Sequence, residues 1–482
     1  MNLKSQAISG VKWSGISMGA VTALQFVTLA VLARLLSPSD FGLMGMIMVV
    51  VGFAQLFADM GISNAIIYRQ DATRKELSSL YWLNILAGIV IFFVICGVSP
   101  LITSFYHEPR LSNLIYLSSL IFLIIPFGQQ FQILLQKELK FDQLAKIQII
   151  GSFANSATAI ILAIMGMGVF SLIWGQLAGT SLRVILLFYW GWGNWRPRLH
   201  FSIRDLKGYI SFGLYQMGEK TVNYFNSNFD YLLIGSLLGA DALGYYTLAY
   251  NLIIRPSSMI NPIITRVAFP VFSRIQNKTV GLKRGYLKVL QFLSVVNFPI
   301  MIGMAVVAPV AIPLIFGEKW IPSIILIQIL SVVGLLRATG NPAGALLLAR
   351  GRADLGFKWN LALMITQIPG LFIGAKLGGT IGVAIAFAIL QILYSVANYL
   401  VLIKTLIGKC FNEYFSSMWP AFWISTIMAM TVFSVSMGLH NMSPSIILAL
   451  EILIGASVYL FLFYIRQKPL LIEIKEIILG KT

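Results

Sequence analysis

The stretch LLSPSDFGLM (residues 35–44) separates two long apolar segments, and a related stretch occurs later in the chain. Shifting the sequence by 202 positions aligns it with LLGADALGYY (residues 237–246). The leucine pairs then coincide, and Gly42 falls opposite Gly244. Each stretch joins one apolar run to the next. An internal match at a fixed offset is typical of a duplicated chain, so the sequence predicts two related halves.

The composition places the chain in a membrane. Of its 482 residues, 58% are hydrophobic and only 11% are charged, and the mean hydropathy is +0.84. Soluble domains carry about 25% charged residues. The few charges of this chain therefore do not suffice to cover a water-exposed surface. The apolar runs also leave no room for a separate soluble domain. The composition therefore predicts one all-α integral membrane protein.

Fourteen segments are long and apolar enough to cross a bilayer, which requires about 20 residues each. They are residues 11–33, 41–66, 80–103, 113–135, 147–165, 169–190, 208–235, 242–270, 287–316, 321–348, 357–375, 380–403, 419–439 and 444–465. The first is full length and lacks a cleavage site, so we expect it to be retained as a span.

The basic residues alternate between the connections. Of the 35 Lys and Arg residues, 26 fall in one set of connections, 4 in the other and 5 within spans. Lys and Arg accumulate in cytoplasmic loops of membrane proteins, so we expect both termini in the cytoplasm. This bias also accounts for the net charge of +18 without a nucleic-acid partner, because no basic run outside the membrane is interleaved with aromatic residues.

The offset and the span count together predict the domain organisation. We expect a six-helix half over residues 1–205, a second six-helix half over 206–410, and two extra helices with a tail over 411–482. Six is even, so the two pseudo-symmetric halves share one orientation in the membrane. Transporters with internal repeats bind their substrate at the interface of the repeats.

Ionisable residues inside a span are costly, so each is a functional hypothesis. Nine fall within the predicted spans: Asp59, Arg183, Glu219, Lys220, Asp230, Arg255, Arg266, Arg337 and Glu451. Five of the nine belong to the seventh and eighth spans. Glu219 and Asp230 are eleven residues apart, about three helical turns, and therefore share a face. Arg255 and Arg266 repeat this spacing. The two polar stripes predict a water-filled cavity.

The family resemblance described below implies a substrate with a phosphate head group, and these positions include candidate groups to bind it. Arg presents paired donors on a planar fork that matches phosphate groups, so we expect Arg255 and Arg337 to bind the anion, with Arg183 and Lys220 as helpers. The remaining predicted cavity residues are Glu219, Asp230, Asn223, Asn226 and Asn251, and the candidates for ion coupling are Asp59, Glu219 and Asp230.

Structural roles remain open for several of these residues. Arg183 has helix packing as an alternative, and Glu219 can form an internal ion pair with the adjacent Lys220. Asp59 can cap the end of a helix. Glu451 lies outside the duplicated region and is expected to serve packing or to lie at the membrane interface.

The sequence offers little for catalysis. Its two cysteines, Cys96 and Cys410, form no metal-binding spacing, and we expect no metal or organic cofactor. His107 and His440 are isolated, and the predicted outer loops are too short for the catalytic loop of a polymerase or ligase. No nucleophile elbow or phosphate-binding glycine loop is present. We therefore expect a transporter rather than an enzyme.

Four motifs carry a resemblance to a known family. They are PSDFGLMGM (38–46), DMGISNAIIYR (59–69), NFDYLLIGSLLGADALGYYTLAYNL (228–252) and FPVFSRIQ (269–276). In these motifs, and in its twelve plus two spans, the chain resembles the polysaccharide transporters of the MOP flippase superfamily, which export O-antigen, capsule or colanic-acid repeat units.

The resemblance implies a flippase of the bacterial cytoplasmic membrane. Its substrate would be an undecaprenyl-pyrophosphate-linked oligosaccharide, moved by alternating access for O-antigen, capsule or exopolysaccharide assembly. H⁺ or Na⁺ coupling is one possibility, and a polysaccharide polymerase and chain-length machinery are candidate partners. The alternative is a cation-coupled multidrug exporter of the same superfamily, whose cavity should be acidic. Five basic against four acidic intramembrane residues favour the flippase. Neither the sugar, the coupling ion nor the oligomeric state follows from the sequence.

Overall fold

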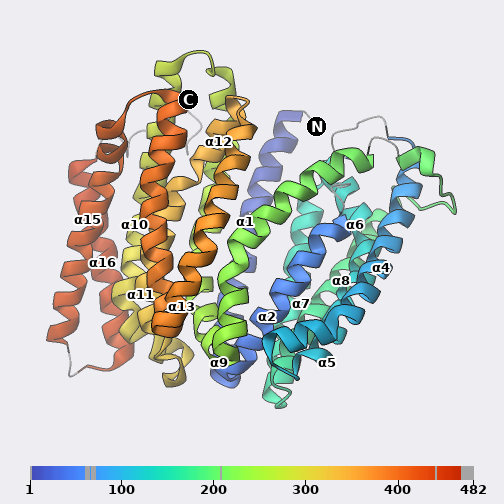
Figure 1. The fold of residues 1–482 in the computed structure, drawn as a ribbon, viewed down its shortest axis with the longest axis horizontal. Helices are drawn as coiled ribbons and strands as arrows, with labels where there is room; N and C mark the ends of the chain where they lie inside the picture. The colour runs from blue at the N-terminus through green and yellow to red at the C-terminus, as the bar shows by residue number, and fades with distance from the viewer. Residues whose placement is uncertain (1–2, 60–65, 67–71, 207–208, 440–441, 468–482) are drawn as a thin grey trace. The chain divides into compact units, whose positions relative to one another are not determined.

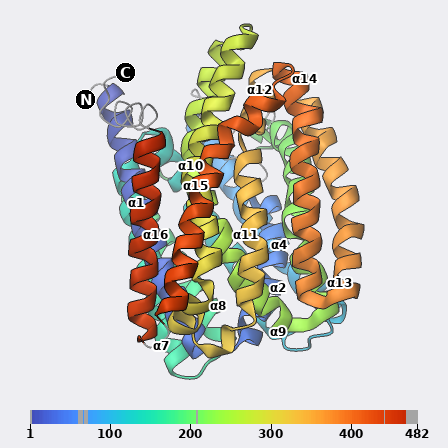
Figure 2. The ribbon, with the colours of Figure 1, turned by 90° about the vertical axis from the view of Figure 1, so that its left-hand side faces the viewer.

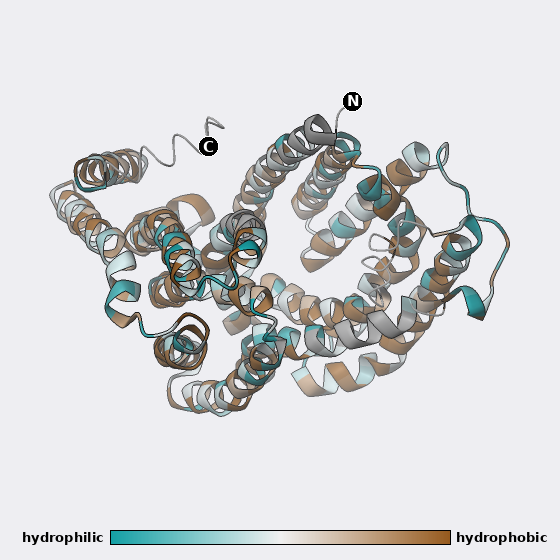
Figure 3. Cartoon of the chain, turned by 90° about the horizontal axis from the view of Figure 1, so that it is seen from above, coloured by the Kyte–Doolittle hydropathy of each residue, from teal (hydrophilic) through white to brown (hydrophobic). Residues whose placement is uncertain are grey.

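The computed structural model describes residues 3–59, 66, 72–206, 209–439 and 442–467, and helices make up nearly all of this part of the chain. Twelve helices in the described residues are long and apolar enough to cross a membrane. Figure 3 shows apolar residues along these helices and hydrophilic residues gathered at the connections. The protein is therefore a multi-pass membrane protein, as the composition predicts.

Two of the twelve helices are much longer than one span. Helix α9 (Tyr209–Arg274) has 66 residues and α13 (Ala353–Asn398) has 46, whereas about 20 residues cross a bilayer. Each contains a point where the backbone leaves helical dihedral angles, at Gly239 in α9 (φ 84°) and at Gly378 and Gly379 in α13. Glycine adopts positive φ angles such as those of Gly239 and Gly379 (φ 56°) without steric cost, and α13 turns back on itself at its break (Figures 1 and 2).

The chain forms two compact units, residues 1–244 and 245–482, with the boundary inside α9. The first unit contains α1 (Leu3–Leu35), α2 (Pro38–Asp59), α4 (Arg74–Tyr106), α5 (Leu111–Ser119), α6 (Ile121–Lys137), α7 (Phe141–Ile164), α8 (Val169–Gly191), the short 3₁₀ helix η1 (Ile203–Leu206) and the start of α9.

Small residues bring α7 and α8 together within the first unit. A β-carbon on Gly175 would lie 2.7 Å from Cβ of Ala159, and one on Gly179 would lie 2.7 Å from the carbonyl oxygen of Gly151. Helices in lipid associate through close packing at such small residues, because burial of apolar groups gives little driving force there. On its other side α7 packs against α1, where Thr28 donates a 2.7 Å hydrogen bond to Ser156.

The connection after α8 is fastened to the start of α4. Ser79 donates a 2.7 Å hydrogen bond to Asp205, whose carboxylate also lies 2.9 Å from Nε2 of His200. Together the hydroxyl of Ser79 and the imidazole of His200 hold the pKa of Asp205 below its ordinary value of 3.8. Trp82 adds a hydrogen bond from its indole nitrogen to the carbonyl of Arg198. This cluster fixes a connection that otherwise has little regular structure.

The SPSD sequence of the repeated joint starts α2 as a capping box. The hydroxyl of Ser37 accepts a hydrogen bond from the backbone N–H of Asp40, and the Asp40 carboxylate accepts one from the backbone N–H of Ser37 at 2.9 Å. Pro38 occupies the first turn, where its missing N–H costs nothing. The second carboxylate oxygen of Asp40 accepts a 3.1 Å hydrogen bond from Val169. One aspartate thus caps both α2 and α8.

The two copies of the joint touch each other reciprocally. A β-carbon on Gly42 would lie 2.6 Å from the carbonyl carbon of Ala240, and one on Gly244 would lie 2.6 Å from the carbonyl carbon of Pro38. Ala240 is the 202-offset equivalent of Pro38, just as Gly244 is that of Gly42. The same backbone contact is therefore made twice, with the roles of the copies exchanged. Only glycine permits so close an approach of two backbones.

The second unit contains the remainder of α9, followed by α10 (Thr279–Phe316), η2 (Glu318–Trp320), α11 (Ser323–Gly340), α12 (Pro342–Ala349), α13, the π-helical turn η3 (Tyr399–Ile403), α14 (Lys404–Ile407), α15 (Phe411–Gly438) and α16 (Pro444–Arg466). Helix α10 packs against α11, α15 and α16. The hydroxyl of Tyr459 in α16 donates a 2.7 Å hydrogen bond to the carbonyl of Val295 in α10.

The two arms of α13 meet at glycines. A β-carbon on Gly374 would lie 2.7 Å from Cβ of Ala386, and one on Gly382 would lie 3.0 Å from the carbonyl carbon of Gly374. These contacts join residues on either side of the break at Gly378 and Gly379, so α13 is a helical hairpin. Glu451 of α16 is buried, with 1% of its surface exposed.

Candidate functional site

The predicted site residues divide between the two units. Arg183, Lys220, Asn223, Asn226 and Asp230 belong to the first unit. Asn251, Arg255 and Arg337 belong to the second. Each group is described within its own unit.

Arg183 lies on α8 and is half-buried against α7. A β-carbon on Gly151 would lie 3.1 Å from its Nε, so that glycine leaves the space which the guanidinium occupies. Nε is buried and has no hydrogen-bond partner among the described residues. A buried cation with an unpaired donor is unfavourable. Such a group is a candidate for contact with an anion that the protein binds.

The polar residues at the start of α9 differ in their exposure. Lys220 and Asn223 are exposed, and Asn226 is half-buried. Asp230 is buried, with 1% of its surface exposed, and its carboxylate accepts a 3.0 Å hydrogen bond from the backbone N–H of Tyr231. The same stretch is attached to α2 by Tyr224, whose hydroxyl donates a 2.8 Å hydrogen bond to the carbonyl of Val49.

In the second unit, Arg337 is held by aromatic residues from two other helices. Its Nη1 donates a 2.8 Å hydrogen bond to the hydroxyl of Tyr250 in α9, and its guanidinium carbon lies 5.7 Å from the ring centroid of Phe387 in α13. Tyr250 in turn stacks on Tyr246 at 5.7 Å between ring centroids. Tyr250 and Phe387 together orient the guanidinium.

Arg255 and Asn251 lie on the α9 segment that carries Tyr250. Arg255 is half-buried, and five residues separate it from Tyr250, a rise of about 7.5 Å along the helix. Asn251 donates a 2.8 Å hydrogen bond to the carbonyl of Thr247. The residues predicted for the second unit thus gather around one segment of α9.

The structure adds polar contacts that the sequence did not point to. Ser257 donates a 3.1 Å hydrogen bond to Asn297 of α10, and Asn297 donates a 3.4 Å bond to Asn261. All three side chains are buried. Asn297 is uncharged and lies in an apolar run, so the pattern of intramembrane charges does not indicate it. The same holds for Tyr250.

The side chains of Asp59 and Glu219 lie outside the described residues, although Asp59 ends α2 and Glu219 lies in α9. Most of the DMGISNAIIYR motif lies outside them as well. Among the residues that are described, no group of three His, Cys, Asp or Glu side chains lies close enough to hold a metal ion.

Comparison with protein families assigns the chain to one family. A family model described as "Polysaccharide biosynthesis protein" matches residues 31–325, about three fifths of the chain. The chain belongs to this family of polysaccharide biosynthesis proteins. The matched region includes both copies of the joint, Arg183 and Arg255.

Two relatives named for polysaccharide biosynthesis align over most of the chain. The lipopolysaccharide biosynthesis protein WzxC of Escherichia coli (strain K12) is 38% identical over 425 residues, covering 88% of this chain and 86% of that protein. The teichuronic acid biosynthesis protein TuaB of Bacillus subtilis (strain 168) is 37% identical over 468 residues, covering 96% of both proteins.

Solved structures show that this family member shares the fold of MOP superfamily transporters. The lipid II flippase MurJ in an inward closed conformation matches with a TM-score of 0.77 at 15% identity, covering 96% of this chain and 100% of that one. An inward-facing MATE family multidrug transporter matches with a TM-score of 0.66 at 15% identity, covering 80% and 94%. At these identities the likeness concerns the fold alone.

Proposed function

We propose that this protein is a flippase that moves an undecaprenyl-pyrophosphate-linked oligosaccharide across the bacterial cytoplasmic membrane. The observation that carries the proposal is the similarity, over 86–96% of their lengths, to proteins named for lipopolysaccharide and teichuronic acid biosynthesis. The fold that it shares with a lipid II flippase fits the same chemistry. The protein is a transporter and not an enzyme.

The membrane topology that we propose has fourteen crossings. Helices α9 and α13 each cross twice, because each is broken at glycine near its middle, and ten further long helices cross once. With both termini in the cytoplasm, the basic connections lie on the cytoplasmic side. The reciprocal contact of the joint copies supports two six-helix halves that rock against each other to give alternating access.

In our proposal the head group binds to a cationic cavity. Arg255 and Arg337 bind the pyrophosphate, and the contacts with Tyr250 and Phe387 hold the Arg337 guanidinium in a fixed orientation for this. Arg183 and Lys220 assist them, and the polar side chains that complete the cavity are Glu219, Asp230, Asn223, Asn226 and Asn251. A charge-assisted hydrogen bond contributes about 1.5–3 kcal/mol, so each arginine should account for roughly 10- to 100-fold in affinity.

The energy source and the partners are further parts of the proposal. Asp59, Glu219 and Asp230 are the candidates to exchange H⁺ or Na⁺ during the cycle. No organic cofactor is required by this mechanism. A polysaccharide polymerase and chain-length machinery would act on the flipped product.

Transport by the purified protein tests the proposal directly. The protein is reconstituted into liposomes with an undecaprenyl-pyrophosphate-linked fluorescent disaccharide, and the amount accessible on each side is followed with a membrane-impermeant quencher. Transfer should be fast with the wild type and slowed at least about tenfold in Arg255→Gln and in Arg337→Gln. The matched control is Arg284→Gln, an exposed arginine of the second unit, which should transport at the wild-type rate.

Two results would overturn the proposal. Wild-type protein that leaves the lipid-linked sugar in its original leaflet is not a flippase for this substrate. Full transfer by both arginine variants removes the assignment of the head-group site. Uptake of a cationic dye coupled to Na⁺ or H⁺, in place of lipid transfer, would establish the multidrug-type function instead.

A further inference from the structure

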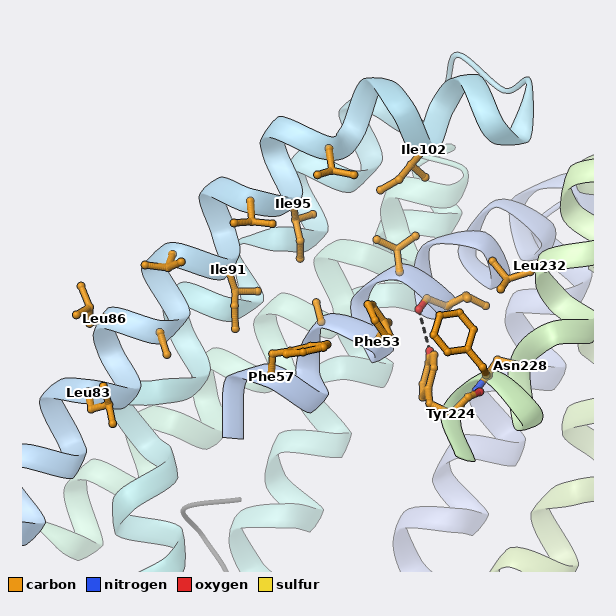
Figure 4. A pocket seen from close by; sticks show the side chains of 18 residues that line it. Phe53, Phe57, Leu83, Leu86, Ile91, Ile95, Ile102, Tyr224, Asn228 and Leu232 are labelled. Atoms are coloured by element: carbon orange, nitrogen blue, oxygen red, sulfur yellow. Dashed lines mark hydrogen bonds between the residues drawn. The ribbon is translucent and has the colours of Figure 1, made fainter. Parts of the chain in front are cut away.

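A long apolar groove runs through the first unit between α2, α4 and α9 (Figure 4). Its volume is about 740 Å³, and sixteen of its eighteen lining residues have pure hydrocarbon side chains. The other two are Tyr224 and Asn228. The Tyr224 hydroxyl donates to the carbonyl of Val49, and the Asn228 amide donates to the carbonyl of Tyr224. Polar groups of the groove are therefore occupied within the protein, and its occupant must be apolar.

The groove is nearly as long as the membrane is thick. Its α4 wall extends from Leu83 to Ile102 as a stripe at helical spacing, which corresponds to about 28 Å at 1.5 Å per residue. The hydrocarbon core of a bilayer is about 30 Å thick. The space follows the length of α4, which suits a chain better than a compact ring system.

The groove is also open to its surroundings. On α4, Val90 and Val94 line it and are nevertheless 51% and 55% exposed. Both side chains are hydrocarbon and belong to a membrane-spanning helix, so their exposed surface suits contact with lipid. The material available to fill the groove is accordingly a lipid chain.

The length of the groove distinguishes between lipid chains. The tails of an ordinary phospholipid remain in their own leaflet, which offers about 15 Å of the roughly 30 Å core. A groove of about 28 Å passes the bilayer midplane, so filling it requires a longer chain or one that changes leaflet. We propose that this groove holds the polyprenyl chain of the transported lipid while the head group crosses the membrane. This inference rests on the proposed function and adds a second binding site to it.

The groove should orient the lipid chain and add little to the affinity for the lipid. Lipid tails are as apolar as leucine, so moving a chain from the bilayer into the groove gains no hydrophobic free energy. What remains is the dispersion contact of the chain with closely packed side chains, including Phe53 and Phe57 of α2. The preference for a long chain should therefore be several-fold and not thousand-fold, while the head group supplies most of the affinity.

Filling the groove tests the proposal, and α4 offers matched controls. Val90→Trp and Val94→Trp place a large ring in the groove. Ile89→Trp and Phe93→Trp place the same ring at the adjacent position, which is exposed but does not line the groove. Binding of undecaprenyl phosphate and of farnesyl phosphate, which share a head group, is measured for each purified protein in nanodiscs.

The ratio of the two affinities is the decisive quantity. The wild type and both control variants should bind undecaprenyl phosphate about five times or more as tightly as farnesyl phosphate. Val90→Trp and Val94→Trp should bring this ratio close to one and leave farnesyl phosphate binding unchanged. Val94→Phe, a smaller change, should give an intermediate ratio if either tryptophan variant unfolds.

Failure of the groove and failure of the proposed function give different results. Equal ratios in Val90→Trp and Ile89→Trp, with head-group binding intact, overturn the groove. If phosphatidylglycerol abolishes the wild-type preference for undecaprenyl phosphate over farnesyl phosphate, any acyl chain fills the groove. This result also overturns the proposal that the groove holds the polyprenyl chain. A wild type that binds neither phosphate lipid contradicts the proposed function itself.

Discussion

Adding one methyl group at the joint should destabilise the first unit. In Gly42→Ala the new β-carbon would start 2.6 Å from the carbonyl carbon of Ala240, whereas ordinary van der Waals contact begins at 3.4 Å. The two backbones must therefore separate by at least 0.8 Å. Neither side can yield by a change of rotamer, because the contact is made between main chains.

The expected penalty follows from the cost of overpacking, which is about 1–3 kcal/mol and occasionally more for packed interiors. A rigid contact belongs at the upper end of this range. Alanine regains about 0.5–1 kcal/mol from its better helix propensity, so we expect a net loss of about 2 kcal/mol. For a unit of this size that lowers the unfolding midpoint by roughly 4–8 °C.

Thermal unfolding of the detergent-solubilised protein measures this effect. Gly97→Ala is the matched control, because Gly97 is a helical glycine of α4 with no atom within 4 Å of its would-be β-carbon. That variant should be as stable as the wild type or slightly more stable. Gly244→Ala should resemble Gly42→Ala, and the double variant should lose less than the sum, since the first separation also relieves the second contact. If Gly42→Ala unfolds at the same temperature as Gly97→Ala, the reasoning is wrong.

Three further predictions concern single side chains. Asp205→Asn should lower the unfolding midpoint at pH 7, and the difference from the wild type should narrow as the pH falls below 3.8, because the lowered pKa of Asp205 gives stability that is fully present above its ordinary value of 3.8 and is lost as the pH falls through the lowered value; a difference of the same size at pH 3 and at pH 7 contradicts this. Arg183→Met should raise thermal stability while reducing transport, since Nε of this half-buried side chain is buried without a hydrogen-bond partner among the described residues and an apolar side chain removes that unsatisfied donor; a destabilised variant would indicate a packing role. Tyr250→Phe should weaken head-group binding by about 3- to 10-fold without altering the protein level, because one orienting hydrogen bond of Arg337 is worth about 0.5–1.5 kcal/mol; unchanged binding would separate Arg337 from the site.

Hydrophobic runs respond directly to the solvent, so the sequence indicates where the apolar helices lie. It predicted fourteen spans, whereas twelve helices of the described residues are long and apolar enough to cross a membrane. The difference lies in α9 and α13, each of which covers two of the predicted spans and is broken at glycine. Leu120, between α5 and α6, keeps right-handed helical angles (φ −54°, ψ −22°), so the predicted fourth span continues through it.

The candidate site shows where prediction from sequence ends. Intramembrane charges are rare, so the sequence alone indicates Arg183 and Arg337 as candidates. It does not indicate the partners of Arg337, because Tyr250 and Phe387 resemble ordinary core residues until the helices are brought together. The apolar groove was missed for a related reason. Its lining valines and isoleucines have the same composition as any lipid-facing helix, and only their arrangement distinguishes them.

The reciprocal glycine contact has a consequence for how such a chain can arise. In a two-fold symmetric homodimer, residue i of one subunit touches residue j of the other while j touches i. The joint reproduces this rule within one polypeptide, with Gly42 against Ala240 and Gly244 against Pro38. Two identical copies of a single half that carried this glycine could make the same contact twice at this point. A two-fold pair of separate chains would satisfy the same geometry as the single chain does.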